Sequence, residues 1–324
     1  RKYAAEIAGQ AGLAAGALVA DIGSNDGSLL EAFAERGCRV VGVDPAVEIA
    51  NRATAEGVPT VPEYFTPDVA ARVRDEHGPA RLVTANNVFA HSDQLPAMAD
   101  GVRLLLDRDG LFTFEVSYLL DIVQKTLFDT VYHEHLCYHS VRSLRAFFAR
   151  HGLELVDARR IPTKGGSLRG TVQLAGGPRP VSPEVGKLVE WEALTRLHSP
   201  ETFRAYARRI EAAREQFGSL LDRCRAAGKV VAGYGASPTV TTLIDQFDLA
   251  GRLDFLVDDN PVKQHTFSPG HHLPVYPSDA IYEREADVVA VLAWQYAAPI
   301  AAKHRKFSDA GGRFVVPLPQ LQVA

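Results

Sequence analysis

The sequence predicts an α/β protein made of two domains, and three observations support this class. Short apolar runs alternate with longer amphipathic stretches through the first 160 residues, and the same alternation returns after residue 228. The chain has 324 residues, which is enough for two domains of ordinary size. Because alternating strands and helices imply right-handed crossovers, each sheet is expected to be largely parallel. We therefore expect one α/β domain at residues 1–160 and a second at residues 161–324.

The elements of the first domain follow from these runs. The expected strands are Leu18–Ile22, Arg39–Val43, Arg81–Ala85 and Gly110–Glu115, and the helical stretches include Ser28–Arg36, Val47–Glu56 and Leu95–Leu106. In such a sheet, ligands bind beyond the carboxyl ends of the strands. Polar residues that lie at or just beyond these ends are Asp21, Asp44, Asn86, Asn87 and Glu115.

The second domain is expected to begin with a loop and a short apolar run and to continue as a long helical stretch. A loop-like segment from Lys164 to Gly170 runs into Thr171–Leu174, and helical sequence then extends from Pro183 to Ala227. The expected strands that follow are Lys229–Ala232, Leu253–Val257, Val288–Ala293 and Arg313–Val316, with a helix from about Pro238 to Phe247. This order is typical of a second, smaller nucleotide-binding fold.

Composition restricts the partners. The 39 acidic and 35 basic residues give a net charge of −4, which does not favour nucleic acid. No apolar run approaches about 18 residues and no signal peptide is evident, so we expect neither a membrane span nor a membrane partner. The three cysteines, Cys38, Cys137 and Cys224, lack C-x-x-C spacing. They indicate a reducing, cytoplasmic setting and argue against a disulfide framework.

The segment Asp21-Ile22-Gly23-Ser24-Asn25-Asp26-Gly27 predicts a cofactor site. An apolar strand enters this loop, a helix leaves it, and the next strand ends at Asp44. Glycines allow the backbone to approach a ligand closely, and a carboxylate at the end of the second strand can accept hydrogen bonds from ribose. The predicted cofactor-binding residues are Asp21, Gly23, Ser24, Asn25, Gly27, Asp44, Asn86 and Asn87.

Two cofactors compete for this loop. A dinucleotide requires the spacing G-x-G-x-x-G, whereas the two glycines here are separated by three residues. Acidic residues at Asp21 and Asp26 are unfavourable beside a pyrophosphate, but they suit the cationic amino group and sulfonium of S-adenosylmethionine (SAM). The loop therefore favours SAM over NAD(P). A glycine-rich turn without a ligand is the remaining alternative.

The run Tyr132-His133-Glu134-His135 concentrates proton-carrying groups that are expensive to bury. Histidine is a natural general base near neutral pH. In an extended backbone Tyr132 and Glu134 would face one way and the two histidines the other. A metal site is a rival interpretation, because His135 and His139 would share a helical face. However, Cys137 replaces the second histidine of H-E-x-x-H and no third ligand is evident, so we expect no metal. A hydrogen-bonded surface turn is the third alternative.

Three further segments carry chemistry that the sequence leaves open. His91 follows the strand-end pair Asn86-Asn87, where it could be structural or catalytic. Lys164, Ser167 and Arg169 could contact phosphate, or the basic side chains could pair with acids on the surface. The loop formed by Gly233, Tyr234, Gly235, Ala236 and Ser237 precedes a predicted helix N-terminus, which favours anions. A tight strand-to-helix turn explains that loop equally well.

Taken together, these motifs resemble a known family. The matching segments are Ile22–Gly27, Asn87–His91, Phe128–His135, Gly165–Arg169, Gly233–Ala236, Asp258–Pro261 and Ala293–Tyr296, which span nearly the whole chain in order. They resemble the SAM-dependent C-methyltransferases of deoxysugar and antibiotic biosynthesis. These enzymes act on nucleotide-linked 4-keto-sugars, and their best-studied branch methylates C-3. The resemblance implies a Rossmann-like SAM-binding domain followed by a second Rossmann-like domain that contributes to the sugar-nucleotide site.

The resemblance also implies roles for individual residues. His135 corresponds to the general base that removes the proton alpha to the ketone, with Tyr132 and Glu134 as its supporting partners. His91 corresponds to a second catalytic histidine near the ketone or enolate oxygen. The implied substrate is a small molecule, most simply a thymidine diphosphate keto-sugar. Family members usually begin with a cysteine-rich zinc-binding domain, which we expect to be missing here because no cysteine precedes Cys38.

Two other functions remain open from the sequence. The first is an NAD(P)-dependent oxidoreductase or epimerase, which the loop spacing and the missing Tyr-x-x-x-Lys pair disfavour. The second is a non-catalytic nucleotide-binding protein, which the intact run from Tyr132 to His135 disfavours.

Overall fold

The computed structural model describes residues 1–323 and divides them into two compact units. Unit 1 contains residues 1–120 and 136–196, and unit 2 contains residues 121–135 together with the chain from residue 197 onward. We expected one division near residue 160. The division differs because residues 153–174 form a hairpin on the first sheet and residues 121–135 fold with the second.

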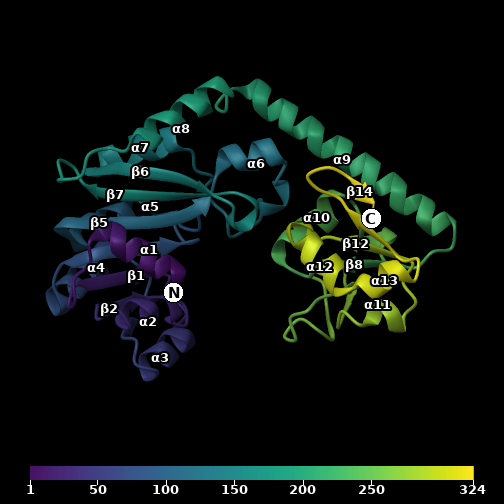
Figure 1. The fold of residues 1–324 in the computed structure, drawn as a ribbon, viewed down its shortest axis with the longest axis horizontal. Helices are drawn as coiled ribbons and strands as arrows, with labels where there is room; N and C mark the ends of the chain where they lie inside the picture. Colours follow the sequence, from purple (N-terminus) through teal and green to yellow (C-terminus); the bar gives the residue numbers. More distant parts are fainter. Residues whose placement is uncertain (324) are drawn as a thin grey trace. The chain divides into compact units, whose positions relative to one another are not determined.

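Unit 1 is built on a seven-stranded sheet with the order β3-β2-β1-β4-β5-β7-β6 (Figure 1). The strands are β1 (Leu18–Ile22), β2 (Arg39–Val43), β3 (Thr60–Val61), β4 (Ala80–Asn86), β5 (Leu106–Ser117), β6 (Leu153–Ile161) and β7 (Ser167–Leu174). Strands β1 to β5 pair in parallel, whereas β7 pairs antiparallel with both β5 and β6. The strand order reverses between β1 and β4, where open α/β sheets bind ligands.

The helices of unit 1 lie around this sheet. They are α1 (Lys2–Ala11), α2 (Ser28–Ala34), α3 (Val47–Ala55), α4 (Pro67–His77), α5 (Leu95–Leu105), α7 (Val141–Arg150) and α8 (Pro183–Leu194). All five residues of β1 are buried, as an apolar run between two parallel neighbours predicts. A cluster of aromatic rings packs beside β5. The ring centroid of Phe89 lies 5.5 Å from that of Phe114 and 5.7 Å from that of Phe148.

The hairpin formed by β6 and β7 was not predicted. Strand β6 alternates charged and apolar residues, which gives it no continuous apolar run. Strand β7 contains Gly170, and a side chain there would lie 2.3 Å from the ring of Phe114. Glycine thus brings β7 close to β5 at the point where a sequence pattern indicates a loop.

Unit 2 contains a second seven-stranded sheet with the order β10-β11-β9-β8-β12-β13-β14. Its strands are β8 (Val231–Tyr234), β9 (Phe255–Val257), β10 (Thr266–Phe267), β11 (Pro274–Tyr276), β12 (Val288–Val291), β13 (Arg313–Val316) and β14 (Gln322–Val323). Its helices are α9 (Pro200–Ala226), α10 (Pro238–Gln246), α11 (Ala280–Glu283), α12 (Ala297–Lys303) and α13 (Arg305–Asp309), as Figure 1 shows. The four strands expected in this domain are confirmed at about their expected positions.

The long helical stretch expected from Pro183 to Ala227 is two helices. Helix α8 ends at Leu194, and Arg196 adopts a positive φ of 51° that ends helical geometry. Helix α9 then begins at Pro200, with the Ser199 hydroxyl accepting from the Thr202 N–H. Within residues 1–323, no helix combines the length and the apolar composition that a bilayer crossing requires.

Residues 121–135 belong to unit 2 although the chain enters and leaves them from unit 1. The segment follows the start of α6 (Leu119–Lys125) and includes the single turn η1 (Phe128–Thr130). Phe128 is buried and stacks on Phe247 of unit 2 with ring centroids 5.0 Å apart. This apolar contact attaches the segment to the second core.

Candidate active site

Two glycines shape the loop after β1. Gly23 and Gly27 have φ values of 70° and 79°, which disfavour other residues. A Cβ on Gly23 would lie 2.3 Å from a methyl group of Val88, so a side chain there would displace the neighbouring loop. The Gly23 N–H donates to the Val43 carbonyl at 2.8 Å. The loop is therefore held against the end of β2.

Asp44 fixes this loop from the next strand. Its Oδ2 accepts a hydrogen bond from the Asn25 N–H at 2.8 Å, and its Oδ1 accepts from the Ala46 N–H at 2.9 Å. The side chain is buried, and each carboxylate oxygen retains a further acceptor site. Asp44 can thus orient the loop and still accept from a ribose hydroxyl. Ser24, in contrast, points its buried hydroxyl toward Gly42, where a Cβ would meet it at 2.3 Å.

Asp21 supplies a buried acid beneath the loop. It is 4% exposed, and its Oδ1 accepts from the Thr84 hydroxyl at 2.6 Å. Burial raises the pKa of the Asp21 carboxyl to about 7, opposed by the Thr84 bond and reinforced by the Asp44 carboxylate. A cationic group bound near Asp21 would favour its ionised form. The site is therefore better suited to a cation than to a pyrophosphate.

The end of β4 presents the two asparagines. The Asn86 Oδ1 accepts from the hydroxyl of Tyr3 on α1 at 2.9 Å, which leaves the amide NH₂ to face other partners. Asn87 has a positive φ of 56°, and its N–H donates to the Glu115 carbonyl at 2.8 Å. The following loop carries His91, whose N–H donates to the Val88 carbonyl at 2.8 Å. These residues lie at the carboxyl edge of the sheet, as expected.

The run from Tyr132 to His135 is a turn and not an extended segment, so the expected alternation of faces is wrong. The His135 N–H donates to the Tyr132 carbonyl at 3.0 Å, and the two rings lie with centroids 4.4 Å apart. His133 and Glu134 are exposed. The rival metal interpretation required His135 and His139 on one helical face, but residues 135–139 are not helical and the two histidines belong to different units.

The turn fixes the protonation of His135. Its Nδ1 lies 2.7 Å from the Thr130 carbonyl oxygen, and its Nε2 lies 3.2 Å from the Tyr132 hydroxyl. Because a carbonyl only accepts, Nδ1 carries the proton of the neutral ring and Nε2 is the basic nitrogen. Burial, and then the Glu134 carboxylate, raises the pKa of Tyr132, which keeps its hydroxyl protonated. A neutral His135 ring with an unprotonated Nε2 is a suitable state for a general base.

Arg169 pairs with acids. Its guanidinium lies 2.6 Å from Glu115 and 3.0 Å from Glu6, and its side chain is 12% exposed. Of the two interpretations left open, ion pairing within unit 1 accounts for its geometry. Ser167 is buried and donates to the Thr163 carbonyl at 3.0 Å, whereas Lys164 is exposed.

The loop after β8 borders a hollow of about 360 Å³ in unit 2. Its lining includes Tyr234, Gly235, Ser237, Lys263 and Lys303. The Ser237 hydroxyl accepts from the Val240 N–H and so also serves as the N-cap of α10. Gly233 lies beneath the loop, where a Cβ would meet Leu256 at 2.6 Å. Asp258 and Asp259 line the hollow as well and pair with Lys263 and Lys303. The hollow therefore combines a helix N-terminus, which favours anions, with two lysine–aspartate pairs.

Polar contacts fix one wall of this hollow. The Tyr234 hydroxyl donates to Asp259 Oδ2 at 2.9 Å and lies 3.2 Å from Nε2 of buried His304. Lys303 bonds to Asp259 and donates to the Ser278 hydroxyl at 3.0 Å. Burial and the Asp259 bond raise the pKa of Tyr234 above its usual value.

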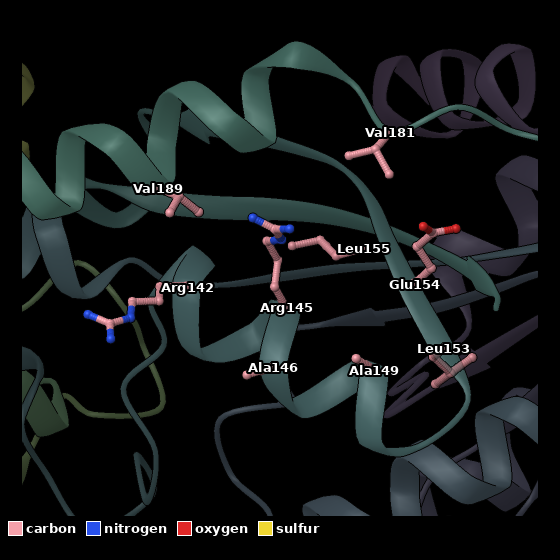
Figure 2. A pocket seen from close by; sticks show the side chains of 9 residues that line it. All are labelled: Arg142, Arg145, Ala146, Ala149, Leu153, Glu154, Leu155, Val181 and Val189. Carbon is pink, nitrogen blue, oxygen red and sulfur yellow. The ribbon is translucent and has the colours of Figure 1, made fainter. Parts of the chain in front are cut away.

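A different hollow, of about 410 Å³, lies between α7, β6 and α8 of unit 1 (Figure 2). Arg142 and Arg145 project from α7 beside the apolar side chains of Leu155 and Val189. None of the predicted site residues lines it.

The sequence missed several residues that support these sites. Tyr3 and Thr84 hold Asn86 and Asp21, and no local motif marks either. Lys303 was also missed, and Asp259 was noted only as part of the segment Asp258–Pro261, without a role. The repeated order of strand followed by aspartate, seen at Asp44 and again at Asp258-Asp259, was the available signal for the second site.

The fold and the sites define a two-unit α/β enzyme with a cofactor loop in the first unit and a basic histidine in the second. Comparisons with known proteins identify its class. Residues 1–158 match a model described as a methyltransferase domain, and residues 162–319 match the C-methyltransferase C-terminal domain. C-methyltransferase NovU of Streptomyces niveus is 37% identical over 313 residues, which cover 96% of this chain and 74% of NovU. The chain belongs to the C-methyltransferase family and is a SAM-dependent C-methyltransferase.

Solved structures share part of the fold. A putative methyltransferase bound to the Trm112 activator of Haloferax volcanii gives a TM-score of 0.42 at 15% identity, covering 54% of this chain and 88% of that chain. Magnesium protoporphyrin IX methyltransferase of Synechocystis, with bound SAM, gives 0.40 at 16% identity, covering 53% and 77%. Similarity at this level adds nothing to the family assignment.

The residues of unit 1 fit SAM. Gly23 allows the loop to pack against Val88, which a Cβ would meet at 2.3 Å, and the Asp44 carboxylate keeps free acceptor sites at the end of β2. The buried carboxyl of Asp21 provides the negative charge that a cationic amino group requires. The donor and acceptor set therefore agrees with the cofactor of the family.

Proposed function

We propose that this C-methyltransferase acts on the carbon alpha to the ketone of a nucleotide-linked 4-keto-deoxysugar, most simply a thymidine diphosphate sugar. His135 removes the alpha proton. The observation that carries this proposal is the bond from His135 Nδ1 to the Thr130 carbonyl, which leaves Nε2 unprotonated. The Tyr132 hydroxyl lies 3.2 Å from this nitrogen, beside the atom that would accept the proton. SAM supplies an electrophilic methyl group on a sulfonium.

The proton moves to a defined atom in this mechanism. His135 Nε2 accepts the proton from the alpha carbon, and the ring becomes an imidazolium that still donates from Nδ1 to the Thr130 carbonyl. The electron pair of the broken C–H bond passes to the ketone oxygen as an enolate. Tyr132 or His91 donates a hydrogen bond to that oxygen, which stabilises the developing charge. Glu134, whose carboxylate acts on the Tyr132 hydroxyl, is the further supporting partner in this proposal.

The cofactor contacts in unit 1 are assigned as follows. Asp44 accepts from ribose hydroxyls, and Asp21 balances the cationic amino group. Gly23, Ser24, Asn25 and Gly27 form the loop that encloses the cofactor, and Asn86 and Asn87 border it from β4. The hydrogen bonds of Asp21, Asp44 and Asn86 support their assignments.

The hollow after β8 is the proposed site of the diphosphate. The α10 N-terminus and Ser237 supply donors, while Gly233 and Gly235 allow close approach. Lys263 and Lys303 pair with Asp258 and Asp259, and each ammonium group has further N–H donors for a phosphate. Tyr234 forms the wall. Lys164 and Ser167 remain predicted substrate contacts. Arg169, also predicted as a substrate contact, pairs with Glu115.

A two-stage assay tests the function. Purified protein is incubated with methyl-labelled SAM and a panel of thymidine diphosphate 4-keto-6-deoxysugars, and labelled product is measured. In deuterated water with S-adenosylhomocysteine (SAH), wild-type protein should exchange the alpha proton without methyl transfer. His135→Ala should abolish exchange, whereas the neighbouring exposed variant His133→Ala should retain it. Exchange that persists in His135→Ala would exclude His135 as the base.

A further inference from the structure

Two residues of the matching segments have no part in this chemistry, yet the structure joins them. Asp129 lies in η1, just before the His135 turn, and Trp294 follows β12, 165 residues later. The indole Nε1 of Trp294 donates to Asp129 Oδ2 at 2.9 Å. Both residues belong to unit 2.

Asp129 depends strongly on this bond. It is 2% exposed, and its other oxygen, Oδ1, is buried without a hydrogen-bond partner in the part of the chain that the structure describes. Burial raises the pKa of the Asp129 carboxyl to about 6, against the lowering effects of the Trp294 bond and, after it, of the backbone N–H groups of Asp129 and Thr130. A buried acid with one side-chain donor is costly to leave unpaired. Its presence therefore needs a reason other than stability.

The position of Asp129 in the chain gives that reason. The next residue is Thr130, whose carbonyl accepts from His135 Nδ1 at 2.7 Å. The backbone around this carbonyl is set by η1, where the Val131 N–H donates to the Phe128 carbonyl at 2.9 Å. Phe128 fixes one side of η1 by stacking on Phe247. The Trp294 bond fixes the next residue.

We propose that Asp129 and Trp294 are positioning residues that hold the Thr130 carbonyl where it fixes the tautomer and orientation of His135. Neither touches the reacting atoms. This inference rests on the proposed function of His135, and it assigns a role to the match at Ala293–Tyr296 that the mechanism leaves unexplained. Through this bond, the strand end of β12 supports the base.

The variants follow from the geometry. Trp294→Phe keeps an aromatic ring and removes the N–H donor, while Asp129→Leu removes the acceptor. Asp129→Asn is the conservative variant, because its carbonyl oxygen can still accept from the indole. The chain has two tryptophans. Trp191→Phe, a half-exposed ring in unit 1, is therefore the matched control.

The first measurements need no substrate. Nitrogen-15 NMR of the His135 ring should show a protonated Nδ1 in wild-type protein, Asp129→Asn and Trp191→Phe. In Trp294→Phe and Asp129→Leu it should show a mixture of tautomers. Hydrogen exchange at the Val131 and His135 amides should accelerate in the same two variants. An unchanged His135 ring and unchanged exchange in both would overturn the proposal.

Kinetics then separate positioning from general damage. Because small misplacements of a reacting group cost up to about 10²-fold, we expect kcat to fall roughly 10–100-fold in Trp294→Phe, with KM for SAM unchanged. The double variant should lose no more than the worse single variant, because both act through one bond. An altered His135 ring with unchanged kcat would overturn the catalytic role. Absence of methyl transfer by wild-type protein would instead count against the proposed function, while the NMR result would still decide whether the pair holds His135.

Discussion

The two sheets of this protein share a strand order and a loop arrangement, and they differ in the side chains at the ends of their strands. In both, a strand-end glycine donates to the last carbonyl of the next strand: Gly23 to Val43 at 2.8 Å, and Gly235 to Val257 at 2.7 Å. In both, the following aspartate accepts from the loop at 2.8 Å, Asp44 from Asn25 and Asp258 from Ala236. The core strand orders β3-β2-β1-β4-β5 and β11-β9-β8-β12-β13 correspond as well.

The difference lies one residue before the end of the first strand. Asp21 pairs in register with Gly42 and Thr84, whereas its counterpart Gly233 pairs with Leu256 and Ala290. Unit 1 thus has a buried acid with a hydroxyl partner, and unit 2 has glycine covered by leucine. The hollow of unit 2 is bordered by two lysines and by the aspartates they pair with, Lys263 with Asp258 and Lys303 with Asp259. The same backbone arrangement therefore holds a buried acid beside a hydroxyl in unit 1 and two acid–base pairs in unit 2.

The largest expected effect separates the base from the cofactor site. His135→Ala should lower kcat by ~10²–10⁴-fold, the usual contribution of a general base. Because His135 belongs to unit 2, SAH affinity measured by calorimetry should stay within twofold of wild type. His133→Ala should change neither value. A kcat within threefold of wild type would remove His135 from the mechanism.

The second prediction compares Asp44 and Asp258, the two aspartates that accept hydrogen bonds from the loops of units 1 and 2. Asp44→Ala should weaken SAH binding by ~10–100-fold, since a hydrogen bond to a charged group contributes about 1.5–3 kcal/mol. Asp258→Ala should leave SAH affinity unchanged and weaken binding of thymidine diphosphate. Calorimetry with both ligands on both variants gives the full comparison. Loss of SAH binding in Asp258→Ala would show that the two sites are not independent.

The parallel strands of the two sheets were largely predictable, because each depends on a local sequence pattern. Buried parallel strands are continuous apolar runs, and Leu18–Ile22 and Arg39–Val43 were located to the residue. The loop residues from Gly23 to Gly27 were predictable because close approach of backbone requires glycine. The hairpin of β6 and β7 was not, since its polar alternation and Gly170 resemble a loop until Phe114 is seen beneath it.

The contacts that complete the sites were beyond the sequence for a different reason. Trp294 and Asp129 are separated by 165 residues, and Tyr3 and Asn86 by 83. Nothing in the local pattern of either partner indicates the other. A turn at His135 was one of the alternatives, but the sequence could not select it, because four polar residues in a row fit an extended segment as well as a turn. Only tertiary structure shows that Tyr132 and His135 meet.

The third prediction concerns the buried acid that distinguishes unit 1. The pKa of Asp21 is raised from 3.8 to about 7, so ligand-free protein holds a proton there at pH 6. A cationic ligand favours the ionised form, and SAH binding should therefore release a proton below pH 7. Affinity should rise several-fold between pH 5.5 and 7.5 and then level. Asp21→Asn should bind more weakly and lose this dependence, and a dependence that survives in Asp21→Asn would assign it to another group.

The same shift predicts an effect on stability. A raised pKa in the folded state contributes stability that is complete below pH 3.8 and is lost as pH rises through 7. At pH 8 the buried charge costs on the order of 4 kcal/mol by this shift. Ligand-free Asp21→Asn should therefore unfold at higher denaturant concentration than wild type at pH 8, with the difference shrinking toward pH 5. Gly233, its counterpart in unit 2, carries no such charge.

The smallest expected effect tests how the helix before each first strand contributes. Helix α1 provides Tyr3, whose hydroxyl donates to Asn86, whereas the buried residues of α9 are Phe217, Gly218 and Leu221. Tyr3→Phe removes a neutral hydrogen bond with a typical net value of 0.5–1.5 kcal/mol, so SAH affinity should fall by roughly 2–10-fold. Tyr64→Phe, at an exposed position of unit 1, is the control. Equal affinities in the two variants would mean that α1 covers the cofactor edge of the sheet without orienting Asn86.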